Sequence, residues 1–580
     1  MAARNLLHGG THYKDLFDTN LPGFVWAMTV LRWLFGSSVI AVRVVDLVVV
    51  LGVVLFIDRL AKWGGATLAT RWWAFAGAAL FYPFTVEMSH AQRDTWMALP
   101  GLAAVAIRVR RGVGETVPSL SGAPRPPNAD HPFRRSFCEG LLWGAGVWMK
   151  PHIALIALAV WLLTARRLAG EHKQPWRAAG LDLLGNLLGG IAIAIPGVVW
   201  LVASGAWSDF LDVFLTWNPW YMKLARQEFD WRVDQELHWF PPWSFGLIVT
   251  VPLALFSVID AALWSSRAAA TEPPRPGPLG RWLPRHLWDK QAGADARFVR
   301  GVLSGVYLVW TAQAFFIQRG FQYAHVPETL LMIGVWTSHR WAWVPLMLAW
   351  LTVTSGLWIV AEHNPNLKHE LDSLPVKTRQ RYLPQHLITD TSRLRLWPEC
   401  WRFNMSDMER YRLWDKLRLH PPHEASISWE EIGEVADFLR SQDVKDGEVI
   451  AWFDSPHAVY LLLDIKPGIR FMHVYTAISI AVNGDDSGVI GREKVWDELQ
   501  KATGAKYVIN DLEWVTLPAG DDPQKRAAML GPPRNPPHDL LPVFTPYPKE
   551  FPFNQPTVFR SRNGTGRYIV HRIVTLGNSP

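Results

Sequence analysis

Cysteine is scarce in this chain of 580 residues, and several familiar motifs are missing from it. The two cysteines, Cys138 and Cys400, are too far apart in sequence to define a disulfide framework or a cysteine metal site. No GxGxxG or P-loop spacing occurs in the C-terminal part, so we assign no nucleotide site to it. No secretory signal precedes the first polar segment.

Hydrophobic residues, in contrast, make up 49% of the chain, and 33 residues are tryptophan. This usage suits a protein with two membrane–water interfaces, where the indole ring lies at the level of the lipid headgroups. The formal net charge is +7, but the arginines cluster beside apolar stretches. We therefore expect membrane lipid as a partner and no nucleic acid.

Apolar stretches follow one another to about residue 360. Two of them are short and are separated by Lys150-Pro151-His152. Span count and loop charge agree only if these two stretches form half-length helices that go out and back across the membrane. The sequence thus predicts a mostly α-helical, polytopic membrane protein with about nine or ten spans. The stretches are Ser38–Ile57, Trp72–Phe84, Trp96–Ile107, Phe137–Met149, Ile153–Leu163, Leu181–Ala203, Phe245–Leu263, Val302–Ile317, Val326–Trp336 and Trp341–Val360.

Arginine and lysine concentrate in four connections between these stretches, near residues 59–71, 108–135, 166–177 and 267–297. The positive-inside rule places such connections in the cytoplasm. The alternate connections, including the first polar segment, and the C-terminal part then lie outside it. We predict an integral protein of a bacterial inner (plasma) membrane with an extracytoplasmic C-terminal domain.

The C-terminal part has a different composition from the apolar stretches. Ser428 to Glu431 match a capping box, and Ile432, Val435, Ala436 and Leu439 form one helix face. Short apolar strands follow, which together with the helices predict a small α/β domain. The predicted strands are Val449–Phe453, Phe471–Tyr475, Lys506–Asn510, Val558–Arg560 and Tyr568–Val574, with a further helix at Glu493–Ala502 and a terminal hairpin around Asn563-Gly564.

The predicted organisation has four parts. Residues 1–37 form an external loop and an interfacial helix, and residues 38–360 form the transmembrane domain. A polar, proline-rich linker covers residues 361–425, and the extracytoplasmic α/β domain covers residues 426–580.

The opening polar segment, Leu7–Gly23, holds a dense set of ionisable side chains and ends in Pro-Gly, where a helix is expected to begin near Pro22. Such a set at a membrane surface indicates a functional site, although a solvated connecting loop is an equal alternative.

Four polar clusters lie at ends of apolar stretches on the predicted external side. Together they could form one cavity, with acids that deprotonate a hydroxyl and cations that hold a phosphate. Each cluster taken alone is explained as well by interfacial snorkelling or helix capping. The clusters are Lys14, Asp15, Asp18 and Asn20; His90, Gln92, Arg93 and Asp94; Lys150 and His152; and Arg319, Gln322, Tyr323 and His325.

Four segments in this order resemble the GT-C superfamily of integral-membrane glycosyltransferases. They read GGTHYKDLFDTNLPG, AQRDTWMALP, GLLWGAGVWMKP and QRGFQYAHVPETL. The pattern is most similar to the branch of the protein mannosyltransferases and the lipid A aminoarabinose transferases. The resemblance covers roughly residues 1–360, and the C-terminal part resembles the extracytoplasmic domain that follows the spans in many of these proteins.

The resemblance implies transfer of a sugar from a polyprenyl-phosphate carrier to an acceptor on the external face. Asp15, Asp18 and Asp94 then match the catalytic acids. The matching substrate-binding residues are Lys14, Asn20, Gln92, Arg93, Lys150, His152, Arg319, Tyr323 and His325. The family's first acid and first transmembrane helix have no counterpart here, so we expect that helix upstream of Met1.

Two functions stay open at this stage. The chain is either a glycosyltransferase or a non-catalytic binder or carrier of lipid-linked sugar. The acceptor, whether protein, lipid or polysaccharide, is not determined by these residues. A divalent metal ion stays open as a cofactor, because two acids three residues apart with no further fixed oxygen ligands are weak evidence for a metal site.

Overall fold

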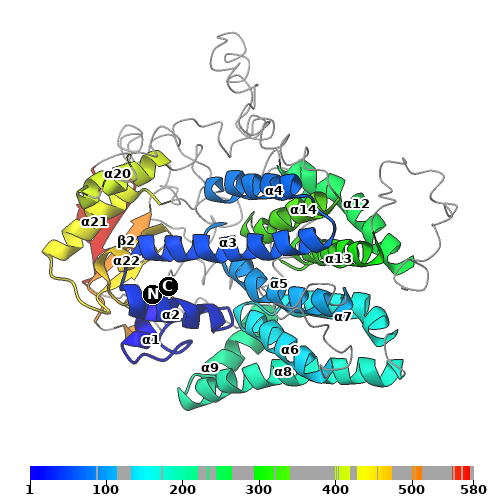
Figure 1. The fold of residues 1–580 in the computed structure, drawn as a ribbon. Coiled ribbons are helices and arrows are strands. Elements are labelled where there is room, and N and C mark those ends of the chain that lie inside the picture. Colours follow the sequence, from blue (N-terminus) through cyan, green and yellow to red (C-terminus); the bar gives the residue numbers. More distant parts are fainter. Residues whose placement is uncertain are drawn as a thin grey trace, which may run out of the picture.

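The computed structural model describes residues 1–85, 89–113, 132–170, 174–219, 243–263, 293–318, 322–339, 404–417, 427–452, 455–472, 504–511, 555–562 and 566–574, with a few isolated positions between them. These residues form a helical body and a C-terminal α/β unit, and α1 and α2 lie beside that unit (Figure 1). The helices of the body are α1 (Ala2–Leu7), α2 (Gly23–Phe35), α3 (Val39–Trp63), α4 (Leu68–Phe81), η1 (Tyr82–Phe84), α5 (Arg93–Gly112), α6 (Pro132–Met149), α7 (Ile153–Gly170), α8 (Pro175–Ala203), α9 (Trp207–Asp212), the π-helical η3 (Val213–Trp217), α12 (Trp243–Leu263), α13 (Ala294–Phe316), η7 (Gln322–His325) and α14 (Val326–Ser338).

Each apolar stretch predicted between residues 38 and 336 coincides with one of these helices, and α2 begins next to Pro22 as expected. Side-chain caps explain where two of these helices begin. The Ser38 hydroxyl accepts a hydrogen bond from the Ala41 amide at the start of α3, and Thr67 does the same for Thr70 at the start of α4. The predicted stretch Trp341–Val360 lies outside the described residues.

The prediction of two half-length helices around Lys150 is wrong, because α6 and α7 are 18 residues long each. The apolar windows underestimated them since both helices continue through charged residues. Arg134 and Arg135 belong to α6, and Arg167 belongs to α7. The three residues Lys150-Pro151-His152 remain the break between the two helices.

Among the described residues, α3 and α8 combine the length and composition of a membrane span, with 25 and 29 residues. Both expose long rows of large apolar side chains, such as Val44, Leu51 and Leu55 on α3 and Leu187 and Ile195 on α8. A water-exposed surface of this kind would be unfavourable, whereas lipid accommodates it. The two helices indicate a membrane protein.

Glycines allow α6 and α8 to pack with their backbones in contact. A Cβ on Gly140 would lie 2.1 Å from the carbonyl oxygen of Asn186, and one on Gly189 would lie 2.1 Å from that of Phe137. No side chain fits at either distance, so this close approach requires glycine. Small residues play the same part at helix interfaces within membranes.

The C-terminal unit contains the helices α20 (Asp407–Leu417), α21 (Trp429–Ser441), η9 (Ser455–His457) and α22 (Ala458–Leu463), and the strands β1 (Val449–Ala451), β2 (Tyr507–Asp511), β3 (Thr557–Arg560) and β4 (Tyr568–Arg572). The strand order is β1-β2-β4-β3, with β1 and β2 parallel and the other pairs antiparallel. The predicted mixed α/β character and the β3–β4 pairing are confirmed. Phe471–Tyr475 and Glu493–Ala502 lie largely outside the described residues, as does the Asn563-Gly564 turn.

The apolar face of α21 is buried as predicted, but the predicted capping box is wrong. The Ser428 side chain accepts no capping hydrogen bond from the first amides of α21. Instead, the first amides of α21 donate to Asp415 of α20, at 2.9 Å from Trp429 and 2.7 Å from Glu430. The Glu431 carboxylate accepts from Ser561 and from the Arg567 amide. A carboxylate distant in sequence has replaced the local cap.

Candidate functional site

The opening segment folds around one buried tyrosine in an unusual backbone conformation. Tyr13 is fully buried and has a φ of 66°, which is uncommon outside glycine. Its hydroxyl donates to the carbonyl of Asn20, so the two ends of the loop are held together. The Asn20 amide and side chain both donate to Asp18, at 3.0 and 2.9 Å. The segment is therefore an ordered turn rather than a loose connection.

Because of this turn, the side chains of Asp15 and Asp18 have different surroundings. Lys14 and Asp15 are exposed, and the Asp15 carboxylate accepts from the Thr11 amide at 2.6 Å. Asp18 instead faces the start of α5, where its carboxylate lies 3.9 Å from Nη1 of Arg93. Lys14 and Asp15 form no hydrogen bond or ion pair with the other three polar clusters among the described residues.

His12 lies next to Asp18 and is fully buried. Its Nε2 is 3.8 Å from the Asp18 carboxylate, and neither ring nitrogen has a hydrogen-bond partner within the described part of the chain. Burial lowers the pKa of His12, although the charge of Asp18 opposes this shift. Because His12 is neutral, Arg93 is the side chain that balances the negative charge of Asp18.

The second and third clusters meet directly next to Arg93. The Lys150 ammonium donates to both oxygens of the Asp94 carboxylate at 2.8 Å, and it also donates to Gln318. It lies 5.7 Å from the centre of the Tyr323 ring, within cation–π range. We call Asp18, Arg93, Asp94 and Lys150 the Lys150 cluster.

The Lys150 cluster brings together residues from the first three segments, and Gln318 of the fourth segment accepts a hydrogen bond from Lys150. Gln318 was not predicted as a site residue, although it is the first residue of the fourth segment and lies two residues after the end of α13. It was overlooked because a single amide at a helix end has no distinctive pattern.

The other predicted site residues lie around the cluster or away from it. Gln92 is the N-cap residue of α5. The buried His325 ring forms a hydrogen bond with Glu328 at 2.7 Å at the start of α14. Burial, helped by the charge of Lys150, lowers the pKa of His152 to about 4, so this ring is neutral at pH 7. Arg319 lies outside the described residues.

A buried carboxylate on α3 supports the turn that precedes α5. Asp46 is fully buried and accepts from the Tyr82 hydroxyl at 2.6 Å and from the Trp96 indole at 2.8 Å. The His90 ring lies 3.7 Å from the same carboxylate. Residue Ala91 has a φ of 52° in this turn. Asp46 thereby fixes the segment from which Arg93 and Asp94 extend.

A second ionic group lies at the other end of α5, and we call Arg108, Arg111, Glu139 and Asp182 the Arg108 cluster. Arg108 lies 2.8 Å from the Glu139 carboxylate and 2.7 Å from that of Asp182. Arg111 lies 2.7 Å from Asp182. The sequence placed both arginines in a cytoplasmic connection, but they are buried or nearly so on α5 and join α5 to α6 and α8.

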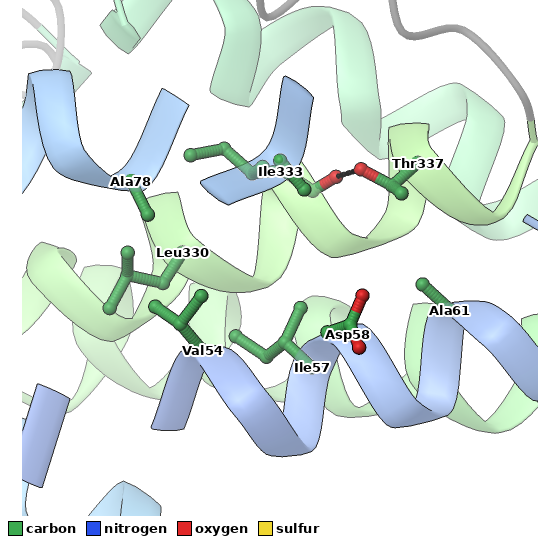
Figure 2. A pocket seen from close by; sticks show the side chains of 9 residues that line it. Val54, Ile57, Asp58, Ala61, Ala78, Leu330, Ile333 and Thr337 are labelled. Atoms are coloured by element: carbon green, nitrogen blue, oxygen red, sulfur yellow. Dashed lines mark hydrogen bonds between the residues drawn. The ribbon is translucent and has the colours of Figure 1, made fainter. Parts of the chain in front are cut away.

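Within the described ranges, no three His, Cys, Asp or Glu side chains gather to hold a metal ion. Figure 2 shows a small cavity between α3, α4 and α14, lined mostly by apolar side chains such as Val54, Ile57 and Leu330. It has room for about one water molecule and does not include any residue of the Lys150 cluster.

No protein-family model and no curated protein matches the chain. Solved structures of the Archaeoglobus fulgidus oligosaccharyltransferase align with it at TM-scores of 0.36 for the form tethered to an acceptor peptide, 0.40 for the apo form, and 0.38 for AglB in complex with an inhibitory peptide and a dolichol-phosphate. The identities are 12%, 11% and 11%, and the alignments cover 88%, 88% and 86% of this chain. The chain spans 64%, 65% and 62% of the length of those proteins. These values assign no role to any residue, and the resemblance to the GT-C superfamily rests on the four sequence segments.

Proposed function

We propose that this chain is an integral-membrane glycosyltransferase that moves a sugar from a polyprenyl-phosphate carrier to an acceptor outside the cytoplasm. The observation that carries the proposal is the Lys150 cluster. It combines an accessible carboxylate, Asp18, with two cations, Arg93 and Lys150, from three separate segments. A transferase of this type needs one group to accept a proton and others to hold a leaving phosphate.

The contacts favour different roles for the two acids of the cluster. Asp94 is 1% exposed and both of its oxygens are occupied by Lys150, so it positions and neutralises that lysine. The Asp18 side chain is 19% exposed and lies 3.9 Å from Arg93, a distance at which the pair is easily opened. Asp18 is therefore the better candidate for the base.

In the proposed reaction, Asp18 accepts the proton of the acceptor hydroxyl or amine. The acceptor atom forms a bond to the anomeric carbon while the bond from that carbon to the carrier phosphate oxygen breaks. The polyprenyl phosphate leaves with the electron pair, and Arg93 and Lys150 hold its charge. Direct displacement inverts the configuration of the anomeric carbon.

The proposal includes the topology expected from loop charge. About nine or ten spans cross the membrane, and the opening segment and residues 426–580 lie on the external side. A reporter that is active only outside the cytoplasm, fused after Pro580, should be active. Activity of a cytoplasmic reporter at the same place would contradict a shared external site.

Binding of a short-chain polyprenyl phosphate to the full-length protein in detergent tests the phosphate role. The phosphate should bind, and the corresponding polyprenol should bind at least tenfold more weakly, since charge-assisted hydrogen bonds contribute about 1.5–3 kcal/mol each. Arg93→Ala should weaken binding of the polyprenyl phosphate and leave binding of the polyprenol unchanged. Arg410→Ala, which removes an exposed arginine paired with Asp407, is the matched control. Equal binding of phosphate and alcohol would overturn the assignment.

A membrane assay with a panel of polyprenyl-phosphate sugars tests catalysis. Transfer that depends on Asp18 would support the transferase. Phosphate-dependent binding without transfer of any sugar would instead favour a non-catalytic binder or carrier of lipid-linked sugar.

A further inference from the structure

The helices α1 and α2, on either side of the opening segment, are attached to the C-terminal unit by a group of four charged side chains. Arg4 of α1 lies 3.1 Å from Asp446 and 3.1 Å from Asp464. Arg32 of α2 also pairs with Asp464. Arg4 is 7% exposed, so its charge depends on these two carboxylates. Two positive charges on the opening helices thus meet two negative charges on the C-terminal unit, where α1 and α2 lie beside α22 (Figure 1).

A second contact lies directly next to the proposed base. The amide of Phe17 donates to the carbonyl of Arg470 at 2.8 Å. The Phe17 ring packs against the ring of Phe471 at 5.2 Å and against that of Trp217 at 5.5 Å. The C-terminal unit therefore holds the backbone of the residue that precedes Asp18.

Asp464 connects the two contacts and has a backbone conformation that suits few residues. It follows α22 with a φ of 53° and a ψ of 47°, in the left-handed region. Aspartate and asparagine tolerate this region better than most other residues. The segment from Asp464 to Phe471 leads from the ion pairs of Arg4 and Arg32 to the partners of Phe17.

We propose that Asp464 is a positioning residue: through Arg4 and Arg32 it holds the C-terminal unit against α1 and α2 and thereby fixes the loop between these helices, which carries Asp18. The consequence for catalysis rests on the proposed function, whereas the attachment itself does not. The Asp464 side chain is 47% exposed, so its pairs with Arg4 and Arg32 are sensitive to salt.

Hydrogen exchange of the full-length protein in detergent tests the attachment without any substrate. Asp464→Asn keeps the left-handed backbone and removes only the charge. Asp443→Asn is a matched control, because Asp443 also has a positive φ of 49° and pairs with a lysine, Lys445, within the same unit. Neither variant removes a buried carboxylate, since both side chains are 47% or more exposed.

Asp464→Asn should speed exchange of the amides of residues 13–19 by about fivefold, the equivalent of losing roughly 1 kcal/mol of local stability. Asp443→Asn should leave them unchanged. Unchanged exchange in Asp464→Asn, or equal acceleration in both variants, would overturn the proposal.

Conservative replacement of the partner separates positioning from general destabilisation. Arg32→Lys keeps a cation near Asp464 and should keep exchange within about twofold of the original, whereas Arg32→Gln should reproduce the effect of Asp464→Asn. Addition of 0.5 M salt should remove the difference between the parent and Asp464→Asn because it screens the pairs. Equal exchange in the two Arg32 variants would contradict an electrostatic attachment. Failure of polyprenyl phosphate to bind would defeat the proposed function and leave this result intact.

Discussion

The two ends of α5 carry ionic clusters with the same formal composition and different surroundings. Each cluster has two acidic and two basic side chains. In the Arg108 cluster every side chain is at most 9% exposed, and the pairs that join Arg108 to Glu139 and Arg111 to Asp182 are 2.7–2.8 Å long. In the Lys150 cluster, Asp94 and Lys150 form a similar close pair, but Arg93 is 25% exposed and lies 3.9 Å from Asp18.

The difference separates a structural group from one that can accept a ligand. A buried ion pair repays its loss of solvation only when its geometry is good and its remaining atoms are bonded. Trp143 and Ser136 supply such additional bonds around the Arg108 cluster. The Asp18–Arg93 pair is long and partly exposed, so replacing Asp18 by another anion next to Arg93 costs little free energy.

Removal of a charge from the Arg108 cluster should have the largest effect on the protein. Arg108→Ala leaves Glu139 and Asp182 buried without their main partner, which should lower the free energy of unfolding by about 3–5 kcal/mol. Thermal unfolding in detergent and the level of folded protein in membranes measure this loss. The exposed neighbour Arg110 is the control, and Arg110→Ala should be close to neutral. Equal stability of both variants would remove the distinction between the two clusters.

Separate substitution of Asp18 and Asp15 should show which of the two acids is the base. Asp18→Asn should reduce sugar transfer by about 10²–10³-fold, a typical cost of losing one preorganised charged group. Asp15→Asn should change transfer by less than about twofold, because Asp15 is exposed and bonded only to Thr11 in the described structure. Equal losses in the two variants would show that the present geometry does not distinguish them.

Paired substitution of Asp94 and Lys150 should separate stability from binding. Lys150→Met alone leaves the buried Asp94 charge without its partner and should both destabilise the protein and weaken polyprenyl phosphate binding by about tenfold or more. Adding Asp94→Asn should recover stability but not binding. Recovery of binding in the double variant would assign Lys150 a purely structural role, like that of Arg108.

The smallest expected effect concerns pH. The pKa of His152 falls from 6.5 to about 4 in the folded protein, so the unfolded chain binds more protons between these values. Stability linked to His152 is therefore present above pH 6.5 and is lost as the pH falls toward 4. His152→Gln should reduce the loss of stability between pH 6.5 and 4.5 by on the order of 1 kcal/mol, as measured by thermal unfolding. An unchanged pH dependence would contradict the burial of this ring.

Hydropathy and strand patterns predicted much of the secondary structure because these elements bury the residues that define them. The α21 face, the strands β1 and β2 and the β3–β4 hairpin all follow local periodicity. The predicted Ser428 cap failed because Asp415, fourteen positions before Trp429, accepts hydrogen bonds from the first amides of α21. The end of α7 was underestimated for a related reason: its Arg167 pairs with Asp295 and donates to the carbonyl of Gly112, both distant in sequence.

The candidate site was predicted as a set of residue types, but its internal assignments required three dimensions. Asp15 and Asp18 look equivalent in sequence, and only the turn at Tyr13 directs one toward Arg93. Glu139 and Asp182 were not predicted at all, because their partner Arg108 is 31 and 74 positions away. An acid within an apolar helix indicates a polar partner but does not identify it.

The attachment between Arg32 and Asp464 also has a consequence in time. The two residues are 432 positions apart, so at a synthesis rate of about 5–20 residues per second Asp464 leaves the ribosome roughly 20–90 s after Arg32. During this interval α3 and α8, the two helices with the length and composition of a membrane span, can already enter the membrane, while the loop with Asp18 still lacks its support. The proposed site would therefore be completed only after these helices have been made, and an interrupted chain would lack the contact to Asp464.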